Sequence, residues 1–560
     1  MSLTHHSSDS RTTTSTQSSK RGKVSRESGL RVPGLRLAVW VAVLVTIGLP
    51  LATVVSTGLS SAGLETLRNP DLLTAVLNSL VSSVCAALGA TVVALILTIA
   101  LDRFKVPEAT ALRWLFLLPF LIPPFISAMS WIALFSPSGP LRSLLGTVLP
   151  NNIYGAGGVI LLLTITSWPM AYLLISSAMA RIPNQLEEAA RVAGASTTRI
   201  YTTITLPLLR PALMASLVLT FASNLSDFGI PALLGLPANY TTLTTLVYRF
   251  IASHSVLNPL PAASAVGTLL LTLACLAVFV QRSVGTTSAA ASTRPTQPAA
   301  RTPLMWALTV ILWAGALITT VLPLLALIRQ AILPAPGVPL RADTVTFANF
   351  THALSNPSVL SGVGNSVLLA IGAGVVCTVL GWAVALLLTR TRSFDNVGLD
   401  IFALLPQALP GLVVAVAWLL VSPLLGIFNT LWAILAAYVM AFSAIVVQMV
   451  RPTSAALSRS FEEAAQTAGA SPTRALLTTS GRFTFPIAIT GGVVVALTAV
   501  RELTISILLV APGTRTLGVV IFNLQQAGDY SAASALAVLV CLVGILGLGL
   551  VTASNRKATA

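Results

Sequence analysis

Charged residues are scarce in this chain. Only 9% of its 560 residues are Asp, Glu, Lys or Arg, whereas a soluble globular domain carries roughly a quarter. Hydrophobic residues make up 55%, and the mean hydropathy is +0.88. A water-soluble enzyme of this size and a disordered chain are both excluded, because neither fits so apolar a composition. The chain must be embedded in lipid.

Residues that build metal sites, disulfides and phosphate-binding loops are also scarce. Each of the four cysteines lies alone inside an apolar run: Cys85, Cys275, Cys377 and Cys541. This spacing argues against a disulfide framework. His254 and His352 have no Cys or carboxylate at ligand spacing, so we expect neither to bind a metal. The sequence contains no Gly-rich loop of the nucleotide-binding type. We therefore expect no catalytic residue, no metal and no cofactor in this chain.

Long apolar runs dominate what remains. A helix that crosses a bilayer needs about 20 mostly apolar residues. Six runs qualify in the first half: Leu37–Thr57, Leu73–Leu101, Trp114–Phe135, Gly158–Ala180, Ala212–Gly235 and Ala262–Val280. Six more qualify in the second half: Leu304–Ile328, Val363–Leu388, Leu399–Val421, Ile427–Val450, Ile487–Val510 and Ala532–Ala553. The sequence predicts an all-α polytopic membrane protein with about 12 spans in two tandem six-helix halves.

The distribution of Lys and Arg predicts the orientation. If the spans alternate from a cytoplasmic N-terminus, most of the 32 basic residues fall in cytoplasmic segments. We therefore expect both termini in the cytoplasm and the chain in the inner (plasma) membrane. The net charge of +16 then reflects topology, so we expect no nucleic-acid partner. The predicted divisions are a disordered tail at 1–32, a first domain at 33–282, a linker at 283–303 and a second domain at 304–555.

The two halves repeat each other in sequence. Asn78-Ser79 matches Asn365-Ser366 at an offset of 287 residues, as Pro119 and Pro123 match Pro406 and Pro410. After the fourth span the offset falls to 275, so the second half lacks 12 residues of an outer loop. With six spans in each half, the two copies have the same orientation in the membrane. The Pro pairs predict kinks in the third and ninth spans.

The segments 181–211 and 451–486 lie between the fourth and fifth spans of each half. Their Glu/Ala-rich runs predict a short helix, with capping boxes at Asn184 and Ser460. Gly194 and Gly469 are placed to end that helix in a left-handed conformation. Ser196 or Thr197 in the first loop, and Ser471 followed by Pro472 in the second, would then start a second helix. Each segment is thus predicted to be a helix, a break and a helix, which suits it to contact a partner.

Both segments read E-E-A-A-x-x-A-G-A-S-x-T-R, which resembles the EAA loop of permease subunits of ABC importers. That resemblance implies that the loops dock on two copies of an ABC ATPase subunit, and that an extracytoplasmic solute-binding protein delivers the substrate. The coupling residues it implies are Glu187, Glu188, Ala189, Ala190, Gly194, Leu206, Pro207, Glu462, Glu463, Ala464, Ala465 and Gly469. The second loop has Gly481-Arg482 where the first has Leu206-Pro207.

Charged residues inside predicted spans are candidates for a transport pathway, because they are costly in lipid. Asp227 lies in the fifth span, and Arg501 with Glu502 occupies the equivalent place in the eleventh. They have structural alternatives. Arg501 and Glu502 can satisfy each other or partners between the halves, and Asp227 can cap a helix break before Gly229.

The surroundings of these charges bear on the substrate. The segments SDFGIPALLG and RELTISILL resemble fused permeases of ferric iron importers. Related permeases for thiamine, phosphonate-type compounds or polyamines stay as alternatives. From another class of protein, an ion-coupled secondary transporter also has six-plus-six halves, but it leaves the duplicated loops unexplained.

Overall fold

The computed structural model describes residues 30, 32–103, 106–136, 139–140, 153–253, 258–283 and 303–559. These residues form helices and turns, with no strand among them. Nearly all of the tail predicted at 1–32, the interior of the linker predicted at 283–303, and His254 lie outside the described residues.

The first half contains six helical regions in the predicted order. The first comprises α1 (Pro33–Val43), a π-helical turn (Leu44–Gly48) and α2 (Leu49–Gly58). The regions that follow are α4 (Pro70–Thr98), α5 (Ala109–Leu117) with α6 (Pro124–Phe135), α8 (Ala156–Met179), α11 (Leu206–Ser226) and α13 (Pro259–Ser283). Short helices α3 (Ser61–Glu65) and α12 (Leu243–Ala252) lie in the connections.

The second half repeats this series. It starts with α14 (Pro303–Ala316), a π-helical turn (Leu317–Val321) and α15 (Leu322–Ala331). The later regions are α17 (Pro357–Arg390), α18 (Asn396–Leu404) with α19 (Gly411–Val421), α20 (Leu431–Ala456), α23 (Arg482–Val500) and α26 (Tyr530–Thr559). Its connections carry α16 (Ala348–Ser355), α24 (Ser506–Leu509) and α25 (Leu517–Gln526).

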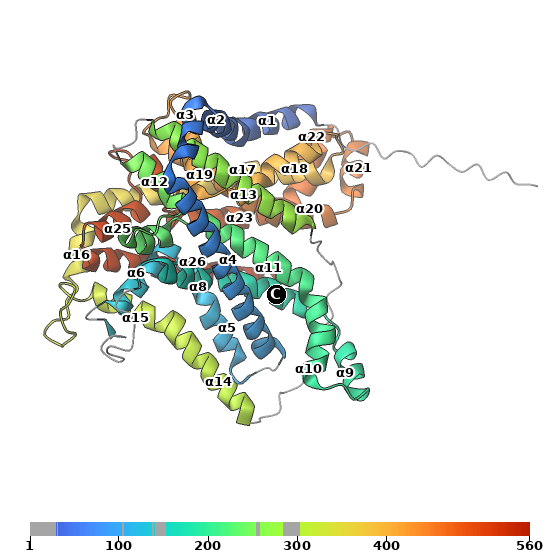
Figure 1. The fold of residues 1–560 in the computed structure, drawn as a ribbon. Coiled ribbons are helices and arrows are strands. Elements are labelled where there is room, and N and C mark those ends of the chain that lie inside the picture. The colour runs from blue at the N-terminus through green and yellow to red at the C-terminus, as the bar shows by residue number, and fades with distance from the viewer. Residues whose placement is uncertain are drawn as a thin grey trace, which may run out of the picture.

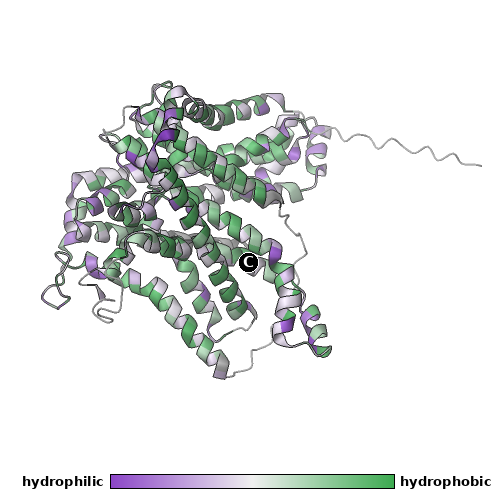
Figure 2. Cartoon of the chain, viewed as in Figure 1, coloured by the Kyte–Doolittle hydropathy of each residue, from purple (hydrophilic) through white to green (hydrophobic). Residues whose placement is uncertain are grey.

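The lengths of these helices confirm the polytopic fold. Among the described residues, nine helices are long and apolar enough to cross a membrane, or up to 11 if each of two bent pairs is counted as one span. The apolar part of α26 that the search covers, Tyr530–Leu546, is shorter. Figure 2 shows apolar residues along the long helices, while hydrophilic residues gather at the short helices on opposite sides of the molecule.

The third and ninth spans differ from single kinked helices. Their two parts meet at angles of 107° and 110°. Ile122 and Leu409 have extended backbones at these breaks, and each is followed by a proline, Pro123 or Pro410. A proline disfavours helical backbone in the residue before it, which ends the first part of each pair. These spans are therefore broken rather than kinked.

The fifth and eleventh spans end earlier than predicted. They were expected to run to Gly235 and Val510, but their helices end at Ser226 and Val500. The backbone leaves the helical conformation at Asp227 and Arg501, the charged positions that the sequence singled out. Both predicted spans therefore end in a break followed by short helical turns.

The two halves exchange contacts through their first spans. α2 of the first half packs against α19 of the second, and α15 of the second packs against α6 of the first. Polar contacts support this exchange: Thr320 Oγ1 donates to the Leu115 carbonyl at 3.2 Å, and Arg36 Nε donates to Asp395 Oδ2 at 2.9 Å. The first span of each half thus lies against the broken third span of the other, as the interleaved ribbons of Figure 1 illustrate.

Candidate coupling surface and pathway residues

The two EAA-like loops fold alike. In the first, α9 (Asn184–Val192) is followed by α10 (Thr197–Ile200), and in the second α21 (Ser460–Thr467) is followed by α22 (Pro472–Leu476). Gly194 and Gly469 have φ angles of +81° and +89°, which confirms the predicted left-handed breaks. The Ser196 and Ser471 hydroxyls accept hydrogen bonds from the backbone N–H three residues on, as expected of helix caps.

The predicted capping boxes are wrong. Asn184 and Ser460 are the first helical residues, and Pro183 and Arg459 occupy the cap positions without a side-chain hydrogen bond to the helix. The carboxylates expected to close these boxes are occupied or exposed instead. Glu187 is turned inward to another partner, and Glu463 points to the surface.

One glutamate of each loop is buried. Glu187 is 6% exposed and Glu462 is 2% exposed. Glu187 Oε1 accepts a hydrogen bond from Thr205 Oγ1 at 2.9 Å, and Glu462 Oε1 accepts one from Ser480 Oγ. Each hydroxyl lies 18 residues after its glutamate, so the same internal contact recurs in both loops. These two glutamates hold the loop to the start of the next long helix.

The second loop shows a buried ion pair that the sequence did not indicate. Arg390, the last residue of α17, forms two hydrogen bonds to the Glu462 carboxylate, at 2.7 and 2.6 Å, and both side chains are 2% exposed. Its guanidinium also donates to the Leu457 and Ser458 carbonyls at the end of α20. Burial raises the pKa of Glu462, but hydrogen bonds from Arg390 and Ser480 outweigh burial, so the pKa is lowered from its ordinary value. No spacing rule connects positions 72 residues apart.

The outer faces of the two loops match in exposure. Glu188 and Ala189 are exposed in the first loop, as Glu463 and Ala464 are in the second, while Ala190 and Ala465 are partly exposed. The residue before the glutamates is a large exposed hydrophobic in both loops, Leu186 and Phe461, each 45% exposed. Figure 1 shows α9 with α10 and α21 with α22 on the same side of the molecule, as two separate projections.

The exits of the two loops differ in structure as they do in sequence. Leu206 and Pro207 start α11, directly after the π-helical turn Tyr201–Thr205. In the second loop Gly481 is buried against Trp382, and a Cβ on Gly481 would lie 3.0 Å from that ring. Arg482 at the next position is exposed. The Trp382 ring thus packs beside the exit of the second loop.

The intramembrane carboxylates cap helix breaks. Asp227 Oδ1 accepts a hydrogen bond from the Ile230 N–H at 2.9 Å. Glu502 Oε1 accepts one from the Ile505 N–H at 2.7 Å, and its other oxygen accepts one from the Ser506 N–H at 3.2 Å. This is the structural alternative that the sequence left open for Asp227. Arg501 does not pair with Glu502 but donates to the Leu121 carbonyl of the other half at 2.7 Å.

The helix breaks of the fifth and eleventh spans lie against the bends of the broken spans. A Cβ on Gly229 would meet Phe125 Cβ at 2.8 Å, just after the Pro123 bend. In the second half a Cβ on Gly411, just after the Pro410 bend, would meet Thr504 Cγ2 at 3.0 Å. We call each contact between a helix break and a bend a membrane junction. Each junction includes one glycine, which lies in the break in the first half (Gly229) and just after the bend in the second half (Gly411).

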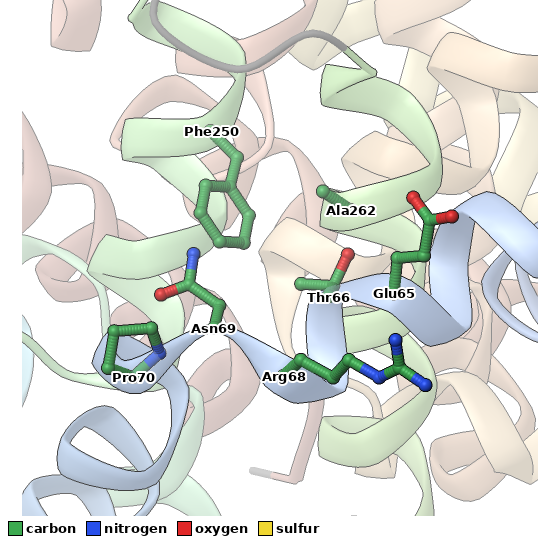
Figure 3. A pocket seen from close by; sticks show the side chains of 7 residues that line it. All are labelled: Glu65, Thr66, Arg68, Asn69, Pro70, Phe250 and Ala262. Carbon is green, nitrogen blue, oxygen red and sulfur yellow. The ribbon is translucent and has the colours of Figure 1, made fainter.

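A cavity of about 350 Å³ opens between the start of α4 and helices α12 and α13. Figure 3 shows its lining, which includes Glu65, Arg68, Asn69 and Phe250. The cavity lies outside both the EAA-like loops and the helix breaks. In the part of the chain that the structure describes, no group of three or more His, Cys, Asp or Glu could hold a metal ion. His352 is exposed on α16.

Comparison with known proteins agrees with this arrangement. The model of the family "binding-protein-dependent transport system inner membrane component" matches residues 107–285 and 377–559, which include both loops. The Fe(3+)-transport system permease protein FbpB 2 of Haemophilus influenzae is 26% identical over 521 residues, covering 90% of this chain and 96% of that protein. The probable ABC transporter permease protein y4fN of Sinorhizobium fredii is 25% identical over 427 residues, or 73% of this chain and 74% of that protein.

A shorter relative matches one part of the chain. The sulfate transport system permease protein CysT of Escherichia coli is 27% identical over 215 residues, which cover 38% of this chain and 77% of that protein. The family implies an ATPase and a binding protein as partners, and it decides against an ion-coupled secondary transporter. Two matched stretches that span more than half of the sequence show that this multi-pass membrane chain belongs to the binding-protein-dependent transport system inner membrane components, the permeases of ABC importers.

Proposed function

We propose that this chain forms the translocation pathway for ferric iron uptake, powered by ATP hydrolysis on two copies of a separate ATPase subunit. The observation that carries the proposal is the pair of coupling loops. Each half supplies one, both lie on the same side of the molecule, and they share the pattern of one buried and one exposed glutamate. Two like surfaces suit two like partners.

The exposed residues define the proposed docking surface. An exposed hydrophobic residue, Leu186 or Phe461, lies beside the exposed glutamate and alanine of each loop. An apolar anchor contributes affinity to such a contact, and the carboxylate fixes the register of the partner. The buried Glu187 and Glu462 act indirectly, because they hold the loop in place. We propose Leu206 and Pro207 as the rigid exit of the first loop.

This arrangement supports the proposed orientation. The coupling loops would face the cytoplasm with both termini, and the opposite side, with α12, α16 and α25, would receive the extracytoplasmic binding protein. We propose the division into domains at 33–282 and 304–555 on the same basis, since each would then carry six spans and one coupling loop.

Ferric iron is the substrate that a match over nearly the whole chain favours. The relative covered over 96% of its length is named as a Fe(3+) permease, whereas the sulfate permease matches only 38% of this chain. Thiamine, phosphonate-type compounds and polyamines are alternatives. The direct test is to purify the cognate binding protein and identify its ligand by metal analysis and mass spectrometry. Bound Fe³⁺ is expected, and an oxyanion without iron or an organic ligand would contradict the iron assignment.

The coupling assignment is tested by reversing the exposed charges. We expect Glu188→Lys with Glu463→Lys to detach the ATPase and to lower ATP hydrolysis stimulated by the loaded binding protein about tenfold or more, because two contacts are reversed at once. Circular dichroism should show unchanged helix content. The matched control is Glu108→Lys, an exposed glutamate outside both loops, which should retain coupling. Normal co-purification and stimulation in the double variant would refute the docking surface.

A further inference from the structure

Arg501 is a charged residue in the membrane region. Its side chain does not cap either helix break, because Asp227 and Glu502 do so. Its described hydrogen bond is one N–H donated to the Leu121 carbonyl, and a guanidinium has five N–H donors. Among the described residues, no carboxylate lies within ion-pair distance of Arg501. The side chain is partly exposed. It therefore has donors to offer to something else.

Two helices place Arg501 well inside the membrane. Its partner Leu121 ends a helical stretch that begins at Ala109, roughly 18 Å away at 1.5 Å per residue. The Leu121 carbonyl also lies 3.8 Å from where a Cβ on Gly544 would stand, and Gly544 is roughly 20 Å into α26. Both depths fall inside a hydrocarbon core of about 30 Å.

The contact also places Arg501 between the halves. Leu121 belongs to the first half, and Arg501 follows α23 of the second. Intramembrane arginines almost always face the bundle interior or a water-filled path, because exposure to lipid is costly. The first half supplies no second cation, since Ser226 occupies the matching position and its hydroxyl donates to the Ala222 carbonyl. Of these two matching positions, only the one in the second half therefore carries a cation.

The two carboxylates at the helix breaks are engaged. Asp227 and Glu502 each accept hydrogen bonds from the first backbone N–H groups of the turns that follow them. Such amides carry partial positive charge, which offsets the carboxylate charge. Neither carboxylate therefore offers a free binding site for a cation, whereas the guanidinium does offer donors to an anion.

We propose that Arg501 is a substrate-contacting residue, and that the species crossing the membrane carries an oxyanion, either free or as a ligand of a metal ion. This inference rests on the proposed transport function and narrows its substrate. A guanidinium binds oxyanions through paired, charge-assisted hydrogen bonds. Ferric iron would fit this pathway as an oxyanion-coordinated complex rather than as the bare cation.

The test measures binding to the purified full chain in lipid nanodiscs. The probes are radiolabelled molybdate and sulfate for the free oxyanion, ferric citrate for the metal-bound oxyanion, and thiamine for an organic cation. We expect at least one anionic probe to bind, and Arg501→Gln to weaken it about tenfold or more. Arg501→Lys should weaken binding less than Arg501→Gln does, because lysine keeps the charge but loses the paired donors.

The outcomes are distinct. Binding of molybdate or sulfate would identify a free oxyanion, and binding of ferric citrate alone would identify a metal-bound one. No binding of any anionic probe, equal binding in Arg501→Gln, or binding of thiamine alone would overturn the inference. Failure of the transport proposal shows separately, because the wild-type chain would then not stimulate ATP hydrolysis by the cognate ATPase and binding protein. Normal stimulation by the wild-type chain together with no binding of any anionic probe would refute only the role of Arg501.

Discussion

The coupling loops repeat residue for residue between the halves, whereas the junctions inside the membrane repeat only in shape. In the loops, the buried glutamate, the exposed glutamate and the left-handed glycine occupy the same positions twice. At the membrane junctions, the close contact is kept but its glycine changes sides, from Gly229 to Gly411. A surface that contacts a partner, as we propose for these loops, must keep its atoms, while an internal contact needs only a complementary fit.

A charge exchange near the start of the broken spans shows the same rule. In the first half, Arg113 of α5 donates to Asp102 at 2.6 Å, and Ser176 donates to the other oxygen of that carboxylate at 2.5 Å. In the second half, the position of Arg113 is held by Asp400, and the position of Ser176 is held by Arg451. These two residues pair at 2.6 Å. Both positions thus make charged contacts in both halves, although the residues that carry the charges differ.

The largest expected effect is at the anchor of the second loop. Arg390→Met would leave the buried Glu462 carboxylate without its cation, which typically costs about 3–5 kcal/mol. We expect a lower thermal midpoint and faster amide exchange across 460–476, with the first loop unchanged. The double variant Arg390→Met with Glu462→Met should recover most of that loss, because no charge remains buried. If the single variant exchanged as slowly as the wild type, the ion pair would not be the anchor.

Replacing the glycine of either membrane junction by alanine should have an intermediate effect on stability. Gly229→Ala would force a Cβ to 2.8 Å from Phe125 Cβ, and overpacking of this kind costs about 1–3 kcal/mol. Gly411→Ala meets the Thr504 methyl group at 3.0 Å, and its next neighbours are side-chain carbons at 3.3 and 3.4 Å, so we expect it to cost less. Thermal unfolding in detergent micelles would rank the two variants.

A compensating change sharpens this comparison. Thr504→Ser removes the methyl group that the new Cβ of Gly411→Ala would meet, so the double variant should regain most of the lost stability. No matching rescue exists for Gly229→Ala, because its nearest neighbours are the Cβ and backbone of Phe125. Equal losses of stability in both glycine variants, or no rescue by Thr504→Ser, would contradict the proposed difference between the two membrane junctions.

Periodicity and motif spacing predicted the helical fold, the repeat and the loop breaks, because these depend on local sequence. The sequence identifies Gly194 and Gly469 as the breaks, since a helix that ends in a left-handed residue favours glycine. Contacts that join distant segments were not predictable in this way. Nothing local indicates that Arg390 binds Glu462 or that Arg501 reaches Leu121. The first capping box failed for the same reason, because a tertiary contact engages the Glu187 carboxylate.

The smallest expected effect concerns the loop glycines. A Cβ on Gly194 or Gly469 would meet nothing within 4 Å, so only the left-handed backbone opposes a side chain there. Gly194→Ala and Gly469→Ala should each cost about 1 kcal/mol, by the same amount in both loops. Amide exchange at 195–200 and 470–476 would measure it, with exposed Thr198→Ala as a control outside the break. A clear inequality between the two variants would show that the loops differ in backbone strain as well as in their exits, which would break the residue-for-residue match.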